Sequence, residues 1–423
     1  MSPSTADEPD AKAGLPTRGS RYAWARRAVL ARLGRLSRGE IVLRERDGLL
    51  RFGSPAPGAP SEVPCVDVVD PRFYRSLALR GSIGAAESYM EGWWDCSDLV
   101  SLVRVLAADS EAARGLERGL ARLARPALKL FHRLHPNSRQ GSGRNIGAHY
   151  DLGNDFFELF LDPSMTYSCG VFEHEAATME EASTAKVERA CQLLDLSPED
   201  HVLEIGGGWG SFAIHAARTC GCHVRTVTLS REQCELARCR VHEAGLTELV
   251  DVELCDYRDV VGSYDKLVSI EMIEAVGHRN LDAFFRICSE RLRPAGAMFL
   301  QAITVSDEDF ARSRSNVDFI KRYIFPGGQL VSVGAVRDSL ARATDLRLSQ
   351  LRDITPHYAK TLACWRGRMA ENLDRMRGLG LPERFLRMWD FYLSYCEGAF
   401  RERANGVVQM LLAKPLHTQA GSG

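Results

Sequence analysis

Residues 202–210 read Val-Leu-Glu-Ile-Gly-Gly-Gly-Trp-Gly, a short apolar strand that runs into closely spaced glycines. Glu204 stands just before the glycines, and a helix is predicted to begin near Ser211. Glycine lets a backbone turn sharply and approach a ligand closely, because it carries no side chain. The helix N-terminus behind the turn presents N–H groups without partners inside the helix. The segment therefore predicts a strand–turn–helix elbow that binds a small ligand.

Two classes of ligand site compete for this elbow. Dinucleotide-binding enzymes use G-x-G-x-x-G and an acidic residue about 20 positions later for the ribose. Here the glycines are Gly206, Gly208 and Gly210, and the next predicted strand, 223–229, is followed by serine and no carboxylate. This spacing resembles the first motif of S-adenosylmethionine (SAM)-dependent methyltransferases. A glycine-rich turn alone is a weak signal, so a nucleotide site or a purely structural turn stays open here.

The composition is that of a globular protein with a sizeable core. A length of 423 residues suits two domains or one domain with an extension, and 45% of the residues are hydrophobic. The twelve cysteines form no CxxC pair, so we expect reduced thiols in a cytoplasmic protein and no metal site. No stretch approaches the roughly 18 apolar residues of a spanning helix. Arginines interrupt the apolar residues near the N-terminus, which argues against a signal peptide.

The net charge of −1 hides an arginine-rich N-terminal third. Segments 22–38 and 114–144 alternate arginine with apolar residues at roughly helical spacing. Such helices suit an anionic lipid surface, and they equally suit a solvated helix packed on the protein by its apolar stripe. No pattern typical of nucleic-acid binding accompanies the charge. The expectation is a peripheral association with the inner face of the cell membrane.

Composition breaks predict five segments. Residues 1–18 and 416–423 read as disordered ends, 19–135 as a lipid-engaging domain, 136–144 as a linker and 145–415 as the main domain. Short strands are expected at 41–43, 49–53 and 65–69, followed by a helical stretch over 73–107. The main domain alternates helices with strands at 202–205, 224–229, 250–254, 267–270 and 298–303, then has a helix at 386–400 and a strand at 406–414. This alternation predicts an α/β fold with a mostly parallel, doubly wound sheet.

Several polar segments are placed where such a sheet binds ligands. Residues 145–170 precede the first strand and read either as a lid or as a plain surface helix and turn. At the end of the second strand lie Thr228, Ser230 and Gln233. These neutral hydrogen-bonding groups could bind a ribose in place of the usual carboxylate. Alternatively, Ser230 caps the helix that follows. Tyr257 and Arg258 follow the third strand, at the edge where an adenine ring would lie.

Two carboxylates, Glu271 and Glu274, follow the fourth strand. Beside a crevice they are suited to base chemistry, although a helix cap or a surface charge explains either one as well. Tyr358 and Cys396 stand alone among apolar residues. Composition by itself assigns both to the core, with their hydrogen bonds satisfied there.

The order of these segments resembles the cyclopropane-fatty-acyl-phospholipid synthases and the related mycolic acid cyclopropane synthases. The resemblance covers about residues 40–415, and the succession of motifs is far more specific than any one of them. The motifs are HYDLGNDFF, TYSC, LEIGGGWG, TLSREQ, DYRD, EMIEAVGH, RYIFPGG, HYAKTL and YCEGAF. The resemblance implies a Rossmann-like class I SAM-dependent methyltransferase domain and a smaller N-terminal α+β or helical domain that helps to engage membrane.

Site residues carry over from the matching motifs. The resemblance places SAM against ten residues: Tyr167, Ser168, Glu204, Gly206, Gly208, Thr228, Leu229, Gln233, Tyr257 and Arg258. It places a bicarbonate ion beside the transferred methyl group, held by the Cys169 backbone, Glu274, Tyr358 and the segment 301–303. Cys396 matches a cysteine long assigned to the active site. Family members usually carry histidine where this chain has Gln301 and Ala275, so bicarbonate is expected to be held more weakly here.

The implied reaction methylates the cis double bond of an unsaturated phospholipid acyl chain. The resulting carbocation loses a proton to bicarbonate and closes a cyclopropane ring. A related branch of the family instead forms a 10-methylene chain from oleoyl lipids, which a separate reductase converts to 10-methyl (tuberculostearic) chains. A homodimer is a further expectation. The alternative of another class is a lipid-surface binding protein with an inactive methyltransferase domain, which the intact Tyr167, Glu274 and Tyr358 oppose.

Overall fold

The computed structural model describes residues 21–109, 153–313 and 317–418. The chain separates into two compact units, 1–124 and 125–423, and each is described by itself. The predicted N-terminal segment 1–18, the basic stretch 114–144 and the linker 136–144 lie outside the described residues, as does most of the predicted tail 416–423. The predicted domain boundaries stay predictions.

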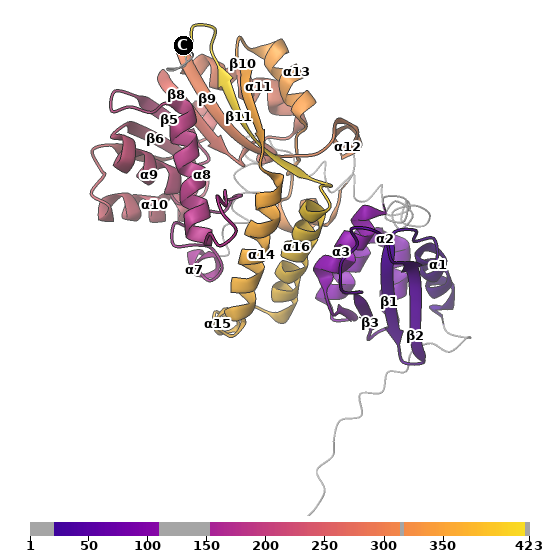
Figure 1. Ribbon diagram of the computed structural model, residues 1–423. Helices are drawn as coiled ribbons and strands as arrows, with labels where there is room; N and C mark the ends of the chain where they lie inside the picture. The colour runs from indigo at the N-terminus through magenta and orange to yellow at the C-terminus, as the bar shows by residue number, and fades with distance from the viewer. Residues whose placement is uncertain (1–20, 110–152, 314–316, 419–423) are drawn as a thin grey trace, which may run out of the picture. The chain divides into compact units, whose positions relative to one another are not determined.

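The first unit is built on a four-stranded sheet in the order β2-β1-β3-β4 (Figure 1). β1 and β2 form an antiparallel hairpin, β3 runs parallel to β1, and β4 runs antiparallel to β3. The three strands predicted here are confirmed. The strands are β1 Gly39–Glu45, β2 Gly48–Ser54, β3 Cys65–Val68 and β4 Trp94–Cys96.

Three helices complete the described part of this unit: α1 Ala23–Leu33, α2 Arg72–Met90 and α3 Leu99–Ala108. The single helical stretch predicted over 73–107 is wrong, because β4 interrupts it. Gly92 takes a left-handed conformation after α2, and Asp98 starts α3 by accepting a hydrogen bond from the Ser101 backbone N–H at 3.1 Å. The helical spacing over 22–38 also extends too far, since α1 ends at Leu33 before Gly34.

The second unit contains a seven-stranded sheet in the order β10-β11-β9-β8-β5-β6-β7. β5 to β9 are mutually parallel, while β11 runs antiparallel to both β9 and β10. The strands are β5 His201–Ile205, β6 His223–Thr228, β7 Val250–Leu254, β8 Tyr264–Ile270, β9 Leu292–Thr304, β10 Arg347–Asp353 and β11 Gly406–Ala413. The mostly parallel sheet is confirmed, and β10 was not predicted because its residues are largely polar and exposed.

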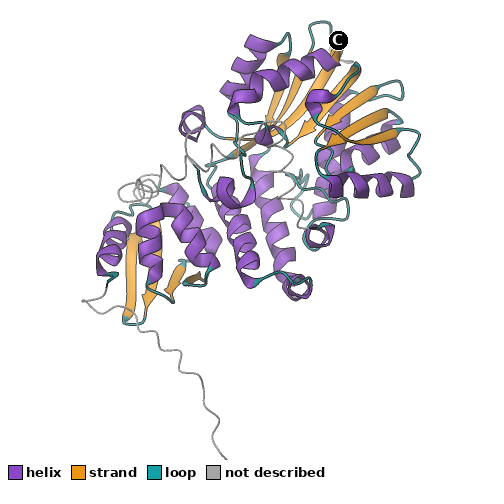
Figure 2. Ribbon diagram, turned by 180° about the vertical axis from the view of Figure 1, so that it is seen from behind, coloured by secondary structure: helices purple, strands orange, loops and turns teal. Residues whose placement is uncertain are grey.

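Helices cover both faces of this sheet, as Figure 2 shows. One core contains Phe212 of α9 and Ala237 of α10, and the other contains Phe284 of α11 and Val336 of α13. The doubly wound arrangement is therefore confirmed. Within the described residues, no helix combines the length and the apolar character that a membrane crossing requires. The helices are α7 Asn154–Glu158, α8 Met179–Leu194, α9 Ser211–Cys220, α10 Arg231–Glu243, α11 Leu281–Arg291, α12 Asp307–Ser313, α13 Val333–Ala343, α14 Thr355–Glu371, α15 Leu373–Gly378 and α16 Glu383–Arg401.

The strand order reverses at β5, which pairs with β6 on one side and with β8 on the other. A crevice opens at such a reversal, outside the carboxyl ends of the strands. The glycine elbow of residues 206–210 follows β5 directly. α14 and α16 pack against each other and carry Tyr358 and Cys396 (Figure 1).

Candidate active site

A cavity of about 400 Å³ lies at the carboxyl ends of the parallel strands, a size typical of small-molecule sites. Ile205, Thr228 and Ile270 line it from the ends of β5, β6 and β8. Most residues predicted for the site meet here. The predicted lining residues are Tyr167, Ser168, Glu204, Gly206, Gly208, Thr228, Leu229, Gln233, Tyr257, Glu274, Tyr358 and Cys396. Arg258, Cys169 and Gln301 lie outside this lining.

The elbow after β5 has the geometry that its glycines predicted. Gly206, Gly208 and Gly210 all have positive φ, at 89°, 54° and 83°, a region that residues with a Cβ rarely adopt. The backbone N–H groups of Gly206 and Gly207 donate to the Val227 carbonyl at 2.9 and 3.1 Å. These bonds fix the elbow against β6. The predicted strand–turn–helix is confirmed, with α9 beginning at Ser211.

Glu204 is buried at the floor of the cavity. Burial raises the pKa of its carboxyl to about 7, and the hydrogen bond from the Thr226 hydroxyl at 2.6 Å opposes that rise. The buried Lys186 also lines the cavity and opposes it through its charge. Lys186 donates to the Ser168 hydroxyl at 2.7 Å, and burial lowers the pKa of its ammonium. A carboxyl so close to a glycine elbow is placed to accept hydrogen bonds from a polar ligand.

The groups after β6 are arranged around a helix start. The Thr228 hydroxyl donates to the Gln233 side-chain oxygen at 2.8 Å, which leaves the Gln233 amide nitrogen to donate elsewhere. Ser230 accepts from the Gln233 backbone N–H at 3.2 Å and so caps α10. The capping explanation of Ser230 is therefore confirmed. Thr228, Leu229 and Gln233 line the cavity, at the position where neutral groups were expected to replace a ribose carboxylate.

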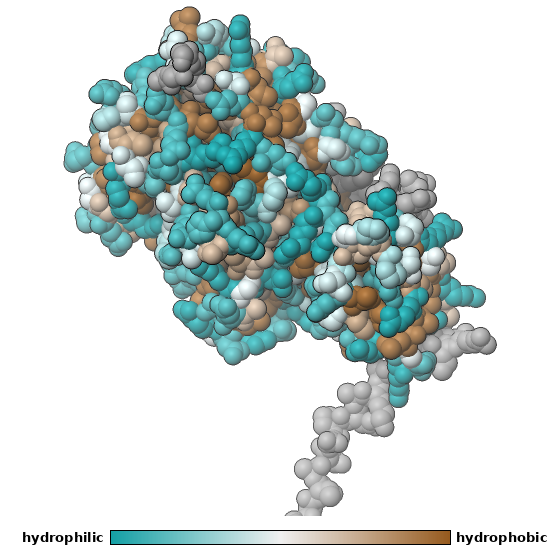
Figure 3. Space-filling view, in the orientation of Figure 1, coloured by the Kyte–Doolittle hydropathy of each residue, from teal (hydrophilic) through white to brown (hydrophobic). Residues whose placement is uncertain are grey.

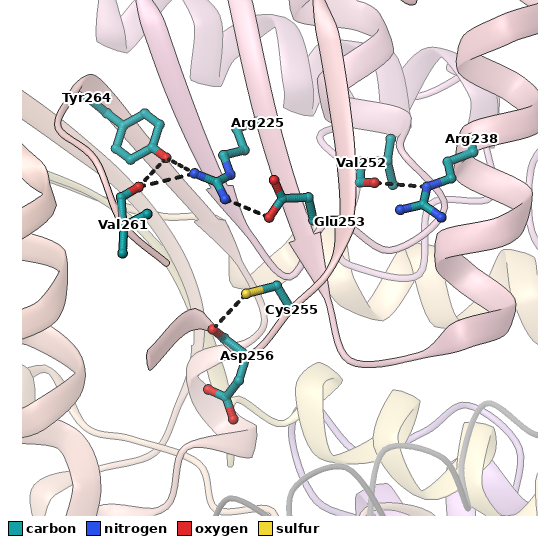
Figure 4. A network of polar contacts seen from close by, with 8 residues as sticks. All are labelled: Arg225, Arg238, Val252, Glu253, Cys255, Asp256, Val261 and Tyr264. Carbon is teal, nitrogen blue, oxygen red and sulfur yellow. Dashed lines mark hydrogen bonds and ion pairs between the residues drawn. The ribbon is translucent and has the colours of Figure 1, made fainter. Parts of the chain in front are cut away.

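An arginine network holds the loop after β7 (Figure 4). Arg225 of β6 donates to Glu253 of β7 at 2.7 Å, and to the Tyr264 hydroxyl and the Val261 carbonyl at 2.9 and 3.1 Å. The side-chain bond to Glu253 raises the pKa of the Arg225 guanidinium above its ordinary value. The network joins β6 and β7 to the start of β8, and thereby fixes the loop that enters the cavity.

Tyr257 lies in that loop and packs its ring edge-on against Phe284, with ring centroids 5.5 Å apart. It lines the cavity, as predicted for the adenine edge. Arg258 does not: its guanidinium pairs with Asp256, donating at 2.8 Å, and lies 5.6 Å from the Tyr257 ring centroid. Arg258 therefore contacts Asp256 and Tyr257 and does not line the cavity.

The predicted lid is described from Gly153 onward, and residues 145–152 lie outside the described residues. Trp209 of the elbow donates from its indole nitrogen to Asn154 at 2.7 Å, which ties α7 to the glycine turn. The Tyr167 hydroxyl lies 3.0 Å from the Tyr392 hydroxyl of α16. The segment before β5 therefore contacts both the elbow and the C-terminal helices at the edge of the cavity.

Glu274 follows β8, is partly buried and lines the cavity. Its Oε1 atom accepts from the Ile303 backbone N–H at 2.6 Å, and its Oε2 atom has no hydrogen-bond partner among the described residues. Burial first, and the carboxyl of Glu271 second, raise the pKa of Glu274 to about 8. A buried carboxyl oxygen without a partner beside a cavity is a candidate for contact with a ligand.

Glu271 also lines the cavity, and the resemblance did not assign it a role. Its Oε1 atom accepts from the Cys169 backbone N–H at 2.9 Å and from the Gln301 amide at 2.8 Å. Burial raises the pKa of Glu271, and hydrogen bonds from Gln301, Cys169 and Tyr358 oppose the rise. Cys169 and Gln301 thus contribute to the site through the Glu271 carboxylate. In the sequence, only the spacing of Glu271 and Glu274 indicates that Glu271 belongs to the site.

The C-terminal helices supply an aromatic wall. Tyr358 is buried, with its ring centroid 4.6 Å from that of Phe400 and 6.1 Å from that of Trp365. Cys396 lines the cavity, but burial raises the pKa of its thiol well above the ordinary value. A neutral thiol is a poor nucleophile, so we expect Cys396 to contribute to the packing of the cavity wall.

Comparisons with known proteins agree with this geometry. Residues 137–410 match the family model described as mycolic acid cyclopropane synthetase. The chain is 41% identical over 348 residues to a tuberculostearic acid methyltransferase, UfaA1, of Mycobacterium tuberculosis, covering 80% of this chain and 81% of the relative. It is 34% identical over 376 residues to the cyclopropane-fatty-acyl-phospholipid synthase of Escherichia coli, covering 88% and 92%.

Solved structures show the same likeness. The cyclopropane synthase MmaA2 of Mycobacterium tuberculosis aligns with a TM-score of 0.61 at 32% identity, over 64% of this chain and 98% of that one. Mycolic acid cyclopropane synthase CmaA1, solved with SAH and CTAB, aligns with a TM-score of 0.60 at 33% identity over the same shares. The Rossmann-like methyltransferase fold predicted from the sequence is confirmed.

Proposed function

The chain belongs to the mycolic acid cyclopropane synthetase family of SAM-dependent methyltransferases, and from that premise we propose that it methylates the cis double bond of an unsaturated phospholipid acyl chain. The observation that carries the proposal is one cavity that joins a glycine elbow to the carboxyls of Glu271 and Glu274 and to an aromatic wall. The elbow holds the nucleoside-bearing methyl donor, and the carboxyls and rings face the reacting carbons.

The chemistry of the lining fits this reaction. The sulfonium of SAM is a strong electrophile and an alkene is a weak nucleophile, so rate comes largely from holding both in line in a dry cavity. The alkene π pair forms the new C–CH₃ bond while the S–CH₃ bond breaks, which leaves a carbocation on the neighbouring carbon. The faces of Tyr358 and Phe325, which line the cavity, stabilise that cation through their ring quadrupoles.

The product is the finer part of the proposal. The same cation closes a cyclopropane ring, or rearranges by a hydride shift and leaves a methylene branch on the chain. We favour the methylene branch, which a separate reductase then saturates, because the relative at 41% identity is named for tuberculostearic acid. Gln301 and Ala275, at positions where the family usually has histidine, are consistent with that branch. The ring is the second candidate, supported by the cyclopropane synthase at 34% identity.

Mass spectrometry of lipids tests the activity and the product together. The full chain would be expressed in cells fed oleate, with and without a flavin- or nicotinamide-dependent reductase, and with empty vector as the control. A gain of one CH₂ with a branch-point fragment supports the methylene product, and the same gain with a ring fragment supports the cyclopropane. Unchanged acyl masses, together with calorimetry that shows no heat of SAM binding, would contradict the proposed function.

Gly208→Ala is expected to weaken SAM binding without unfolding the protein. A Cβ added at Gly208 meets no atom of the described residues within 4 Å, so the cost to folding is the left-handed φ of 54°, about 1 kcal/mol. The methyl would project into the lined cavity, where the donor lies against the elbow. We expect the Kd for SAM to rise about ten-fold or more by calorimetry, which is about 1.4 kcal/mol. An unchanged Kd would place the donor elsewhere.

We further propose that the first unit brings the enzyme to the inner face of the cell membrane, as a peripheral cytoplasmic protein. Trp24 and Val69 are 39% and 62% exposed, and Figure 3 shows hydrophobic side chains at the surface of this unit. Arg27 is exposed about one turn along α1 from Trp24. An exposed ring beside an arginine suits an anionic lipid surface. A Trp24→Ala, Arg27→Ala double substitution should reduce flotation with phosphatidylglycerol vesicles.

A further inference from the structure

The groups expected to hold a bicarbonate ion are already bonded within the chain. The Cys169 backbone N–H and the Gln301 amide both donate to Glu271 Oε1, at 2.9 and 2.8 Å. The Ile303 backbone N–H donates to Glu274 at 2.6 Å. Bicarbonate at this place would be a further anion beside the Glu271 carboxylate, and like-charge repulsion opposes its binding. The residues present therefore do not fit the ion.

The Glu271 carboxylate occupies the position at which the Cys169 N–H and the Gln301 amide would otherwise bind an ion. Its oxygen is where the lid and the end of β9 converge, since Cys169 belongs to the segment before β5 and Gln301 to β9. Tyr358 of α14 also acts to lower the pKa of this carboxyl. Two segments far apart in the sequence thus present donors to one carboxyl oxygen. Such convergence holds an anion in place, as an ion-binding site would.

The backbone at Glu271 is unusual as well. Its φ is 49°, in the left-handed region, which costs a residue with a Cβ about 1–2 kcal/mol. The Glu271 N–H donates to the Gln301 carbonyl at 2.8 Å and holds the residue in that conformation. Glu271 is partly buried and lines the cavity. A strained residue that presents a carboxyl to a cavity is typical of a functional position.

The charge on Glu271 has a partner in the same cavity. Lys186 is fully buried, and its charge lowers the pKa of Glu271. The Lys186 ammonium donates to Ser168, which places the cation between the lid and the floor of the cavity. Glu271 in its ionised form is thereby neutralised without an added ion. The Glu271 carboxyl in turn raises the pKa of Glu274, as the second cause after burial.

We propose that Glu271 is the built-in base of this enzyme, and that turnover needs no bicarbonate. The inference rests on the proposed function. After methyl transfer, the Glu271 carboxylate takes a proton from the cationic acyl chain. The electron pair of the broken C–H bond forms the new carbon–carbon bond, as a ring or as an alkene. The proton leaves Glu271 for water when the product leaves, and SAH departs as the neutral thioether.

The test is methyl transfer in buffer stripped of carbon dioxide, compared with the same buffer containing millimolar bicarbonate. The full chain would act on vesicles of dioleoyl phosphatidylglycerol with methyl-labelled SAM, and both SAH release and labelled lipid would be measured. Wild-type turnover is expected to agree within about two-fold between the buffers. A loss of about ten-fold or more on removing bicarbonate would overturn the inference while leaving the proposed function intact. A wild type that labels no lipid in either buffer would contradict the proposed function, and the inference with it.

Two variants of Glu271 make the assignment specific. Glu271→Gln keeps the shape and removes the base, so turnover should fall about 100-fold or more in both buffers, while calorimetry shows SAM still bound. Glu271→Gly relieves the left-handed φ and frees the donors for an added ion, so bicarbonate should restore its turnover about ten-fold or more. Glu188→Gln, on α8 beside His215, is the matched control and should behave as wild type. Full turnover by Glu271→Gln, or a Glu271→Gly variant indifferent to bicarbonate, would overturn the inference.

Discussion

Glu274→Gln is expected to lower kcat/KM for the lipid by about 100-fold or more, which corresponds to about 2.7 kcal/mol of lost transition-state stabilisation. The Glu274 carboxyl lies in the cavity with Oε2 free of any described partner. Its charge would stabilise the carbocation, and the neutral amide of glutamine keeps the shape without that charge. The bond from the Ile303 N–H survives, because an amide oxygen accepts it equally well.

The pH profile separates this electrostatic role from a structural one. The pKa of Glu274 is raised to about 8, so the fraction ionised in the free enzyme grows as pH rises through that value. If the ionised form is required, kcat/KM for wild type should climb up to about pH 8 and level off above it. Glu274→Gln should lose this limb, because a glutamine amide does not titrate.

Glu235→Gln is the matched control for the substitution of Glu274. Glu235 is exposed on α10, so the same loss of a carboxylate there should leave both the rate and the pH profile unchanged. SAM affinity measured by calorimetry should stay within about three-fold of wild type in both variants. Turnover by Glu274→Gln within a few-fold of wild type would contradict the assigned role of this carboxyl.

Much of the fold follows from local sequence, because each element carries its own signal. The apolar run before Gly206 predicts β5, and the glycines predict the turn. The parallel strands are covered by helices on both faces, and their sequences are therefore continuous apolar runs. Such runs predict strands directly. β10 lacks such a run, since it lies at the edge of the sheet and its residues are mostly exposed. β4 is only three residues long, too short for a strand pattern to be recognised within the predicted helix over 73–107.

The site was less predictable where it depends on contacts between distant residues. The elbow, the Thr228–Gln233 pair and Tyr257 each follow a strand end, so their convergence follows from the topology. The bond from Cys169 to Glu271 joins residues 102 positions apart, and that from Gln301 to the Cys169 carbonyl spans 132. No local pattern encodes such pairings. The resemblance therefore placed Cys169 and Gln301 near an ion, and the three-dimensional structure places Glu271 between them.

Gly207→Ala should destabilise the second unit by about 3–5 kcal/mol, although Gly207 has no positive φ. A Cβ there would lie 1.8 Å from the Thr226 hydroxyl oxygen and 3.2 Å from Glu204 Oε2. Thr226 must move, and its 2.6 Å hydrogen bond to the buried Glu204 carboxyl is then lost. Overpacking and an unsatisfied buried carboxyl each cost about 1–3 kcal/mol. The melting temperature should drop by about 10 °C in calorimetry.

Gly245→Ala distinguishes the clash expected in Gly207→Ala from the general loss of stability on replacing a glycine. Gly245 follows α10 with φ 68°, and a Cβ there meets no described atom within 4 Å, so Gly245→Ala should cost about 1 kcal/mol. Removing the Thr226 hydroxyl gives the new methyl room. The double variant Gly207→Ala, Thr226→Ala should therefore be more stable than the sum of the single losses by about 1 kcal/mol or more. Strict additivity, or a Gly207→Ala variant as stable as Gly245→Ala, would show that the elbow moves away from β6 without breaking the Thr226–Glu204 bond. The close packing of the elbow on β6 would then not be what holds Glu204 in place.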